Sequence, residues 1–263
     1  MMKLPIVGVS GITIGANGNR QSSRAGKSLV SEELQSKLGF ASIAFADALK
    51  RGAMHWFGFD DETMWGPSGA RDSDSRIGSA QTHEFLYDPS SNALRCRRCN
   101  AVPSQGQQCP VKAPYTARTV LQQLGEAARR LDYNVWVNRV LDDIRMVEEG
   151  CEYSKDRGPF KAGKGLKPCG VVVSDVRFPN EIEGLRRKKA FMIRVVRQIE
   201  DDVASMNELH DSERALLDMP DEAFDYVLYN KSPEQAKKEI VEIVKHLPVT
   251  QLTTGPLVDR RRA

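Results

Sequence analysis

The sequence predicts an α/β protein with a doubly wound, mostly parallel sheet flanked by helices. Short apolar runs alternate with segments of helical periodicity along most of the 263 residues, and this alternation is typical of strands joined by helical crossovers. One run, Val171 to Ser174, is apolar almost throughout, as strands covered on both faces are. One polar segment, residues 60–114, breaks the alternation and is predicted to be an insertion.

Each element follows from a local pattern. Val30, Leu34 and Leu38 recur at helical spacing, and Gly39 is a plausible stop for that helix. The segment from Gly150 to Gly170 has no period and is predicted to be a loop. The predicted strands are Pro5–Val9, 41–45, Val171–Ser174, 191–196 and 225–229. The predicted helices are one after Lys27, one through Leu49 and Trp56, and those near 116–131, 133–149, 181–188 and 236–247.

These elements divide the chain into three parts. Residues 1–59 and 115–247 form the predicted main α/β domain. Residues 60–114 form an inserted subdomain that contains Cys and His. Residues 248–263 are predicted to be a flexible basic tail.

Composition limits the classes of function. The net charge of +3 is too small to predict binding of nucleic acid through bulk charge. No N-terminal signal pattern is present, and no apolar run approaches the ~20 residues of a membrane span. The five cysteines do not form an even disulfide framework, so we expect a reducing, cytoplasmic environment with a metal or free thiols.

Residues 7–34, VGVSGITIGANGNRQSSRAGKSLVSEEL, contain an incomplete phosphate-binding motif. Gly26, Lys27 and Ser28 match the end of G-x-x-x-x-G-K-[ST], but Gln21 stands where the motif has its first glycine. The chemistry requires backbone N–H groups and a helix N-terminus that face the phosphates. We therefore expect a stretched loop, in which residues 12–24 are an excursion. The alternative is a solvated Gly-Lys-Ser in an ordinary turn.

In this interpretation each loop residue has a role. Lys27 neutralises the β- and γ-phosphates of ATP, and Ser28 holds Mg²⁺. The predicted ATP-binding residues are Gly11, Ala25, Gly26, Lys27 and Ser28.

The insertion contains the ligand types of a structural zinc site. Cys96 and Cys99 form a C-x2-C pair, Cys109 follows, and His83 lies upstream. A Cys3His set closes a zinc tetrahedron, and a polar insertion without a core of its own would need such a metal to fold. Free thiols are the alternative, and His83 is the weakest of the four predicted ligands.

Four segments resemble the bacteriophage deoxynucleoside monophosphate kinases, a branch of the P-loop nucleotide kinases. The resemblance covers most of the chain outside the insertion, and VVVSDVRFPNEIEGLR is its most specific segment. The phosphate loop of that family is compact, whereas an excursion splits it here. The segments are FADALKRGAMHWFGFD (45–60), TARTVLQQLGEAARRLDYNVWV (116–137), VVVSDVRFPNEIEGLR (171–186) and FDYVLYNKSPEQ (224–235).

The resemblance implies an acceptor site on the helix from Thr116. Arg118, Gln122 and Arg129 share one face, and Val120, Leu124, Ala127 and Leu131 take the opposite face. Spacing alone favours a solvated polar face. The resemblance instead implies that Arg118 clamps the acceptor phosphate, that Gln122 contacts the base or sugar, and that Arg130 assists. Trp136 would stack on a base or fill core.

The resemblance also implies the transfer site. Asp175 and Arg177 follow the buried strand, at the end where parallel sheets place their ligands. Asp175 would support Mg²⁺, directly or through water, and Arg177 would neutralise charge on the transferring group. Glu181 would position the acceptor side or Arg177, and Lys50 would approach the acceptor phosphate. Their alternatives are a surface Asp–Arg pair and a solvated helix lysine.

The expected activity is therefore Mg²⁺-assisted transfer of the γ-phosphoryl group of ATP to a deoxynucleoside 5′-monophosphate. One alternative is a P-loop kinase for another small acceptor, such as a dephospho-coenzyme A-like substrate. The other is a zinc-bearing nucleic-acid-binding protein. The family resemblance implies a homodimer and, for a phage-encoded chain, the host cytoplasm; we expect no membrane partner.

Overall fold

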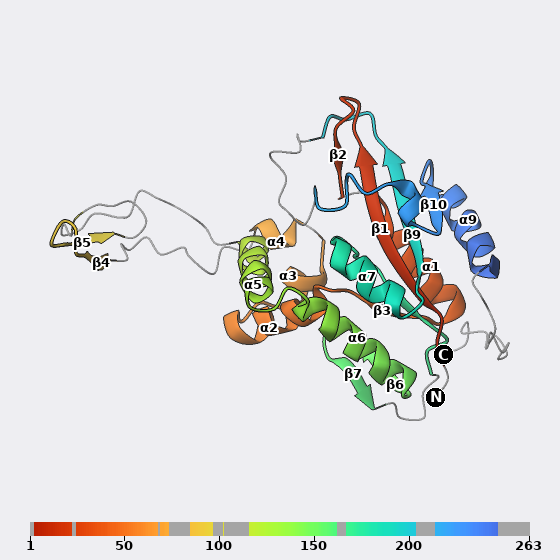
Figure 1. Cartoon of the computed structure of the whole chain (residues 1–263), viewed down its shortest axis with the longest axis horizontal. Helices are drawn as coiled ribbons and strands as arrows, with labels where there is room; N and C mark the ends of the chain where they lie inside the picture. The colour runs from red at the N-terminus through yellow and green to blue at the C-terminus, as the bar shows by residue number, and fades with distance from the viewer. Residues whose placement is uncertain are drawn as a thin grey trace. The chain divides into compact units, whose positions relative to one another are not determined.

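A computed structural model describes residues 3–22, 25–67, 69–73, 85–96, 102, 116–161, 167–203 and 214–246 (Figure 1). The chain forms two compact units. Unit 1 comprises Met1–Ala48 and Asp132–Ala263, and unit 2 comprises Leu49–Leu131. The segment predicted to be an insertion, 60–114, belongs to unit 2 together with the helices on either side of it.

Unit 1 is built on a mostly parallel sheet with the strand order β10-β9-β1-β8-β3. Every neighbouring pair in this order is parallel, and only the short strand β2 pairs antiparallel, with β1. The fold is therefore a mixed α/β fold compatible with a doubly wound sheet, as the sequence predicts. The strands are β1 (Ile6–Ile14), β2 (Arg20–Gln21), β3 (Ala41–Ile43), β8 (Val171–Val173), β9 (Phe191–Gln198) and β10 (Tyr226–Tyr229).

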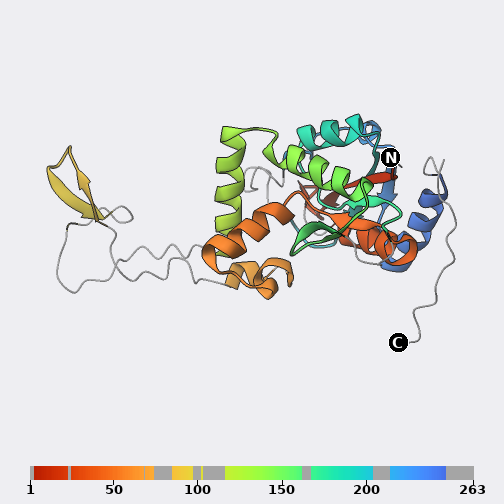
Figure 2. The ribbon, with the colours of Figure 1, turned by 90° about the horizontal axis from the view of Figure 1, so that it is seen from below.

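Helices cover both faces of this sheet (Figure 2). Helices α1 (Lys27–Leu38) and α9 (Pro233–His246) pack on one face. Helices α6 (Val135–Glu148) and α7 (Pro179–Arg187) pack on the other face. Successive strand side chains point to opposite faces, so Val172 joins the α1/α9 core while Val171 and Val173 join the α6/α7 core. This explains why the strand sequence is continuously apolar.

Strand β1 is longer than the sequence predicts. It continues past Val9 to Ile14, and the chain returns as β2, with Thr13 opposite Gln21. The predicted excursion over residues 12–24 thus begins as a β-hairpin. The two glycines of the strand reflect close packing, because a Cβ on Gly8 would lie 2.5 Å from Met192 Cε, too close for any real contact.

The predicted loop between Gly150 and Gly170 is wrong for its first half. Residues 151–161 form an antiparallel hairpin of β6 (Cys151–Ser154) and β7 (Gly158–Lys161). The hydroxyl of Tyr153 donates to Asp47 Oδ2 (2.9 Å), and this links the hairpin to the chain that follows β3. Tertiary contacts of this kind stabilise strands that have little periodicity of their own.

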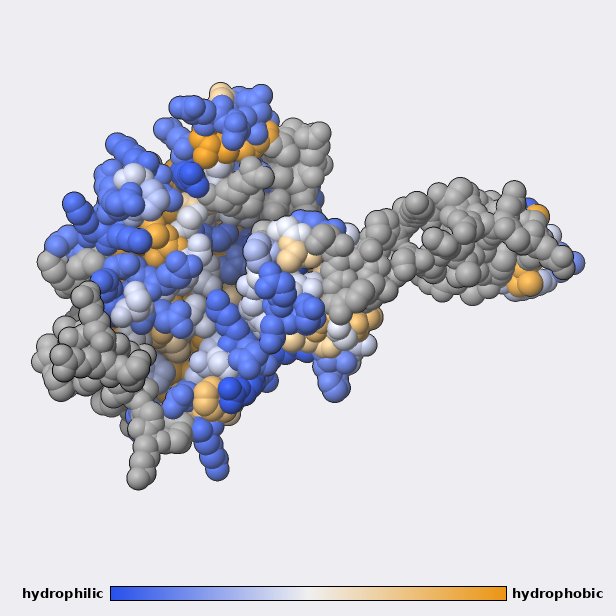
Figure 3. All heavy atoms as spheres, turned by 180° about the vertical axis from the view of Figure 1, so that it is seen from behind, coloured by the Kyte–Doolittle hydropathy of each residue, from blue (hydrophilic) through white to orange (hydrophobic). Residues whose placement is uncertain are grey.

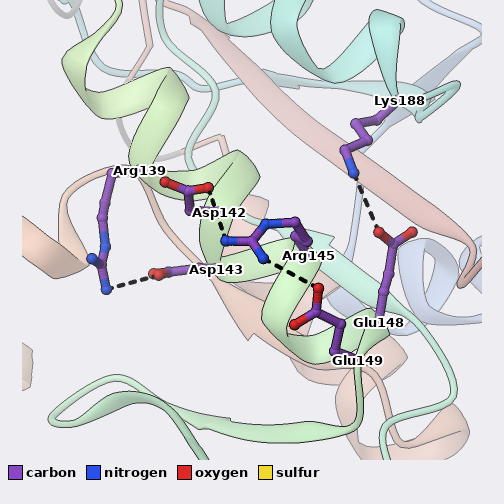
Figure 4. A network of polar contacts seen from close by, with 7 residues as sticks. All are labelled: Arg139, Asp142, Asp143, Arg145, Glu148, Glu149 and Lys188. Carbon is purple, nitrogen blue, oxygen red and sulfur yellow. Dashed lines mark hydrogen bonds and ion pairs between the residues drawn. The ribbon is translucent and has the colours of Figure 1, made fainter. Parts of the chain in front are cut away.

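Helix α6 carries a solvated face of paired charges (Figure 4). Arg145 contacts both Asp142 and Glu149, at spacings of three and four residues. Lys188, just after α7, reaches Glu148 Oε2 at 3.2 Å and joins the two helices. Exposed pairs of this type contribute about 0–1 kcal/mol each, so the apolar face of α6 supplies most of its stability.

Unit 2 contains a small helical core. Ala53, Phe59, Met64, Ala117 and Val120 are buried together. These residues come from α2 (Asp47–Phe57), the turn after it, α3 (Asp61–Trp65) and α5 (Ala117–Leu131). The unit also contains α4 (Ala70–Ser73) and an antiparallel pair of strands, β4 (Phe85–Asp88) and β5 (Ala93–Cys96).

Helix α5 departs from its predicted apolar face in its second half. Val120 is buried as expected, but Ala127 is exposed and Leu131 is 92% exposed. The periodicity continues to the end of the helix, whereas the core of the unit contacts only its first turns.

The described surface is mainly polar. In Figure 3 hydrophilic side chains cover most of the described part of the visible face, and hydrophobic side chains form only small groups. Within the described ranges, no helix combines the length and the hydropathy that crossing a membrane requires.

Candidate phosphate-binding site

The carboxyl ends of β1 and β8 place the predicted catalytic residues in one region of unit 1. The chain leaves β1, turns back through β2 and enters α1 at Lys27. Asp175 follows β8, the strand beside β1. Parallel α/β sheets bind their ligands at this edge, so sequence positions almost 150 residues apart meet where a ligand is expected.

The turn before α1 suits an anion. Gly26 has φ +94°, in the left-handed region, and no side chain caps the helix that begins at Lys27. The first turn contains no acidic residue, and Ser28 is exposed. A helix N-terminus carries partial positive charge and N–H groups that attract phosphate.

Lys27 is held over this turn. Its Nζ donates to the backbone oxygen of Ser22 (2.7 Å) and lies 3.5 Å from Asp175 Oδ1. Its side chain is only 12% exposed. The ammonium group is therefore pre-positioned beside the helix start, and it lacks the freedom of a solvated lysine.

Asp175 is shared by two cations. Arg177 Nε donates to Asp175 Oδ1 at 2.7 Å, the oxygen that Lys27 also approaches. The three side chains carry a net charge of +1, and Asp175 and Arg177 are 23% and 29% exposed. The group is thus reachable from solvent and electrostatically favourable for an anion.

Glu181 fixes the backbone of this turn. Its buried carboxylate accepts N–H bonds from Arg177 (2.6 Å) and Phe178 (3.1 Å). The second bond satisfies the N-terminus of α7, in the manner of half a capping box. Glu181 therefore holds the backbone at Arg177, and its role in catalysis stays a prediction.

Two further residues at this site were not predicted from the sequence. The hydroxyl of Ser22 is buried and finds no hydrogen-bond partner among the described residues. The side-chain amide of Asn230 donates to the backbone oxygen of Ala25 (3.0 Å). Only the excursion and the general resemblance of residues 224–235 pointed to these regions, because contacts across such separations leave no local pattern.

Gly11 lies beneath the turn. A Cβ on Gly11 would be 2.7 Å from Ala25 Cβ and 2.8 Å from Lys27 Cγ. Glycine here allows the loop to pack directly on β1. A contact between Gly11 and nucleotide stays a prediction.

The oxygen donors at the site suit magnesium. The Asp175 carboxylate and the Ser28 hydroxyl are hard ligands of the kind that Mg²⁺ takes together with phosphate oxygens and water. A bound Mg²⁺ would neutralise charge on the phosphates of a nucleotide.

The predicted acceptor residues Lys50, Arg118, Gln122 and Arg130 belong to unit 2. Arg118 is paired although partly exposed: its Nε and Nη2 donate to the two oxygens of Asp72 at 2.5 and 2.9 Å. The hydrogen bond to Arg118 lowers the pKa of Asp72 below its ordinary value of 3.8. The predicted phosphate clamp thus already binds a carboxylate in a fork-to-fork geometry.

The other predicted acceptor residues differ in their surroundings. Lys50 lies over the ring of Trp65 at 5.9 Å, and Gln122 is half-buried on α5. Arg130 is 76% exposed and pairs with Glu126. Trp136, in unit 1, packs against the α6/α7 core, which is the commoner of its two predicted fates.

Most of the predicted zinc site lies outside the described residues, namely His83, Cys99 and Cys109. Cys96 ends β5 opposite Phe85 of β4. Within the described part of the chain, no cluster of three or more His, Cys, Asp or Glu side chains could hold a metal.

Comparison with known proteins adds no family assignment. No family model matches the chain, and no curated protein matches it. The functional interpretation therefore depends on the residues and the geometry described above.

Proposed function

We propose that the chain is an ATP-dependent kinase that transfers the γ-phosphoryl group to a deoxynucleoside 5′-monophosphate. The observation that carries the proposal is the convergence of Lys27, Asp175 and Arg177 at one edge of a parallel sheet. They adjoin an uncapped helix N-terminus that follows a left-handed glycine. Phosphoryl transfer needs little covalent work from the protein, so positioned cations and Mg²⁺ would supply most of the rate.

The roles follow from the contacts. Lys27 would exchange part of its contact with Asp175 for the β- and γ-phosphates. Arg177, held by Asp175 and by the backbone bonds to Glu181, would face charge that develops on the transferring group. Asp175 and Ser28 would hold Mg²⁺, with Asp175 acting directly or through water.

The choice of acceptor comes from the resemblance and from the residues of unit 2. Arg118 binds a carboxylate with both arms of its guanidinium group, and a phosphate presents the same pair of oxygens. Lys50, Gln122 and Arg130 complete the proposed acceptor set. ATP and the monophosphate are the proposed small-molecule partners, in the cytoplasm, and the homodimer is likewise a proposal.

The zinc proposal rests on the ligand types of the insertion. Cys96 ends β5, and His83, Cys99 and Cys109 lie outside the described residues. A structural Zn²⁺ held by His83, Cys96, Cys99 and Cys109 would give this polar segment a reason to fold.

The test of function is production of ADP from ATP with each deoxynucleoside monophosphate, alongside dephospho-coenzyme A. We expect turnover with at least one monophosphate and its loss in Lys27→Ala, with Lys37→Ala, on an exposed position of the same helix, as the matched control. Far-UV circular dichroism should show that all three proteins are folded.

The opposite results distinguish the alternatives. Turnover only with dephospho-coenzyme A would reassign the acceptor. No turnover, together with salt-dependent DNA binding, would favour the nucleic-acid-binding alternative. Near-normal turnover in Lys27→Ala would contradict the phosphate-loop assignment.

A further inference from the structure

Asn230 connects the last strand of the sheet to the turn before α1. It follows β10 and is only 8% exposed. Its backbone N–H donates to Val196 O of β9 (2.8 Å), and its side-chain Nδ2 donates to Ala25 O (3.0 Å). The side chain therefore extends from a backbone anchored to the sheet and fixes one carbonyl of the proposed phosphate loop, 205 positions earlier in the chain.

The same side chain determines which residue can stand at position 26. A Cβ built on Gly26 would lie 2.3 Å from Asn230 Nδ2, far inside van der Waals contact. The φ of +94° at Gly26 independently disfavours any other residue. The glycine of the Gly-Lys-Ser motif thus fits against Asn230 as well as serving the turn.

The hydrogen bond from Asn230 to Ala25 also determines the direction of the next backbone donor, the Gly26 N–H. The Ala25 carbonyl and the Gly26 N–H belong to one planar trans peptide, so they point to opposite sides of the chain. Because Asn230 draws the carbonyl toward itself, the Gly26 N–H points away from Asn230. Helix α1 has no side-chain cap that could orient this peptide instead.

We propose that Asn230 is a positioning residue that aims the Gly26 N–H at the phosphates of the bound nucleotide. This inference rests on the proposed function of the loop and adds to it a residue from the opposite end of the chain. Asn230 does not touch the ligand; it removes the freedom of the Ala25–Gly26 peptide to flip. Binding then requires less ordering of the loop, which is how preorganisation raises affinity.

The chain offers a matched control in Asn180. It is also 8% exposed, and its Nδ2 donates to the backbone carbonyl of Tyr133 (3.1 Å) and to Asn134 Oδ1 (3.1 Å). Replacement of either residue by leucine removes a buried amide of similar shape without adding charge. A purely structural role predicts similar losses of thermal stability in the two variants and no difference in ligand affinity.

The experiment is calorimetric titration of the full chain with inorganic tripolyphosphate and with ATP, well below the unfolding temperature. We expect Asn230→Leu to weaken both ligands about tenfold, equivalent to about 1.4 kcal/mol, and Asn180→Leu to leave both dissociation constants within twofold of wild type. Asn230→Ala should reproduce the loss and serves if the leucine variant does not fold.

The results separate this inference from the proposed function. If a folded Asn230 variant binds both ligands as tightly as wild type, while Lys27→Ala does not, the positioning role is wrong and the phosphate loop stands. If wild type binds neither ligand, or if Lys27→Ala binds both normally, the phosphate loop fails and the role of Asn230 fails with it. Equal losses of ligand affinity in the Asn180 and Asn230 variants would also overturn the inference.

Discussion

The ion pairs at the two proposed sites leave their cationic side chains with different attraction for an incoming phosphate. Lys27 and Arg177 share one carboxylate, Asp175, so each retains attraction for an incoming anion. Arg118 has the two oxygens of Asp72 to itself, and a phosphate would have to displace that carboxylate or bind beside it. Affinity at Arg118 is therefore expected to depend on Asp72, whereas Lys27 is held in place by the backbone oxygen of Ser22 as well.

Arg118→Ala should raise KM for the monophosphate far more than KM for ATP. The proposed clamp contacts only the acceptor. The variant should therefore lose binding of the monophosphate to the same extent in the ground state and in the transition state, which raises KM. Arg157→Ala, which removes an exposed arginine without a role in the proposed site, provides a comparison for the lost charge. Steady-state kinetics with each substrate varied in turn measures the effect. An equal rise in both KM values would contradict the assignment of Arg118 to the acceptor.

The Arg118–Asp72 pair should also leave a signature in acid. Its hydrogen bond lowers the pKa of Asp72 in the folded state, so the pair stabilises the fold above the unfolded pKa of about 3.9. That contribution is lost as the pH falls through the lowered folded pKa. Asp72→Asn should therefore be less stable than wild type at pH 7, by about 0.2–1 kcal/mol as for exposed pairs.

Urea unfolding at pH 7 and near pH 3 would measure this difference in the free energy of unfolding. The gap between wild type and Asp72→Asn should shrink toward zero in acid. Arg118→Ala, which removes the other partner of the pair, should show the same convergence with wild type in acid. A gap that stays constant with pH would mean that the pair does not stabilise unit 2 through its charge.

At the scale of elements, the sequence predicts helices and strands correctly where their buried residues recur with a regular period. It fails where contacts with distant parts of the chain determine the structure. The strand Val171–Val173 and helix α7 follow from apolar runs and a helical repeat. The β6–β7 hairpin does not, because the short strands Cys151–Ser154 and Gly158–Lys161 are mostly half-buried and have no strong alternation. The glycines of β1 suggested that the strand ended, although they mark places where other side chains press on its backbone.

The same reasoning applies to the proposed site. Gly26, Lys27 and Ser28 are adjacent in sequence, and Asp175 follows an obvious strand, so both could be predicted. Ser22 accepts a bond from Lys27 through its backbone oxygen, and Asn230 donates its side-chain amide to a distant carbonyl. Neither contact follows from a sequence period, so both are found only in the folded chain.

The hairpin formed by β1 and β2 allows a test of the stretched loop. Its tip is bonded to the chain after β9: Ala16 N–H donates to Asp201 O, and Asn17 Nδ2 donates to Val203 O. These bonds lie on the hairpin, apart from the turn that leads into α1. Replacement of residues 15–19 by a two-residue Asn-Gly turn should keep the pairing of Thr13 with Gln21 and leave ATP affinity within about tenfold, or ~1.4 kcal/mol.

Calorimetry and turnover of the shortened enzyme distinguish three outcomes. Retained affinity and turnover would show that residues 15–19 are needed neither for nucleotide binding nor for transfer. Retained affinity with a lower kcat would assign a contribution to transfer to the hairpin tip, residues 15–19. Loss of ATP binding would mean that the excursion itself builds the nucleotide site, and the stretched-loop interpretation would be wrong.

At the scale of the whole molecule, the two units have different sources of stability. Unit 1 buries a sheet between two helical layers, with a separate apolar cluster on each face. The core of unit 2 is small and draws on helices α2, α3 and α5. The turn of the β4–β5 hairpin is held by polar contacts, since Asp88 accepts from Ser90 and Ser91. These hydrogen bonds lower the pKa of Asp88 to about 2, so the turn keeps its charge at any physiological pH.

An isolated two-stranded hairpin is marginally stable in water, and this makes metal content the decisive measurement for the insertion. We expect about one zinc per chain in purified protein, as a closed tetrahedral site requires. Cys96→Ser or Cys99→Ser should lose that zinc and expose residues 80–112 to protease, whereas Cys169→Ser, at an exposed free cysteine of unit 1, should retain both the metal and the resistance to protease.

Elemental analysis measures the zinc content, and limited proteolysis measures the resistance to protease. His83→Ala should weaken binding less than either cysteine change if a water or another side chain can replace it as the fourth ligand. Metal-free wild type with the same protease pattern as the cysteine variants would identify the cysteines as free thiols.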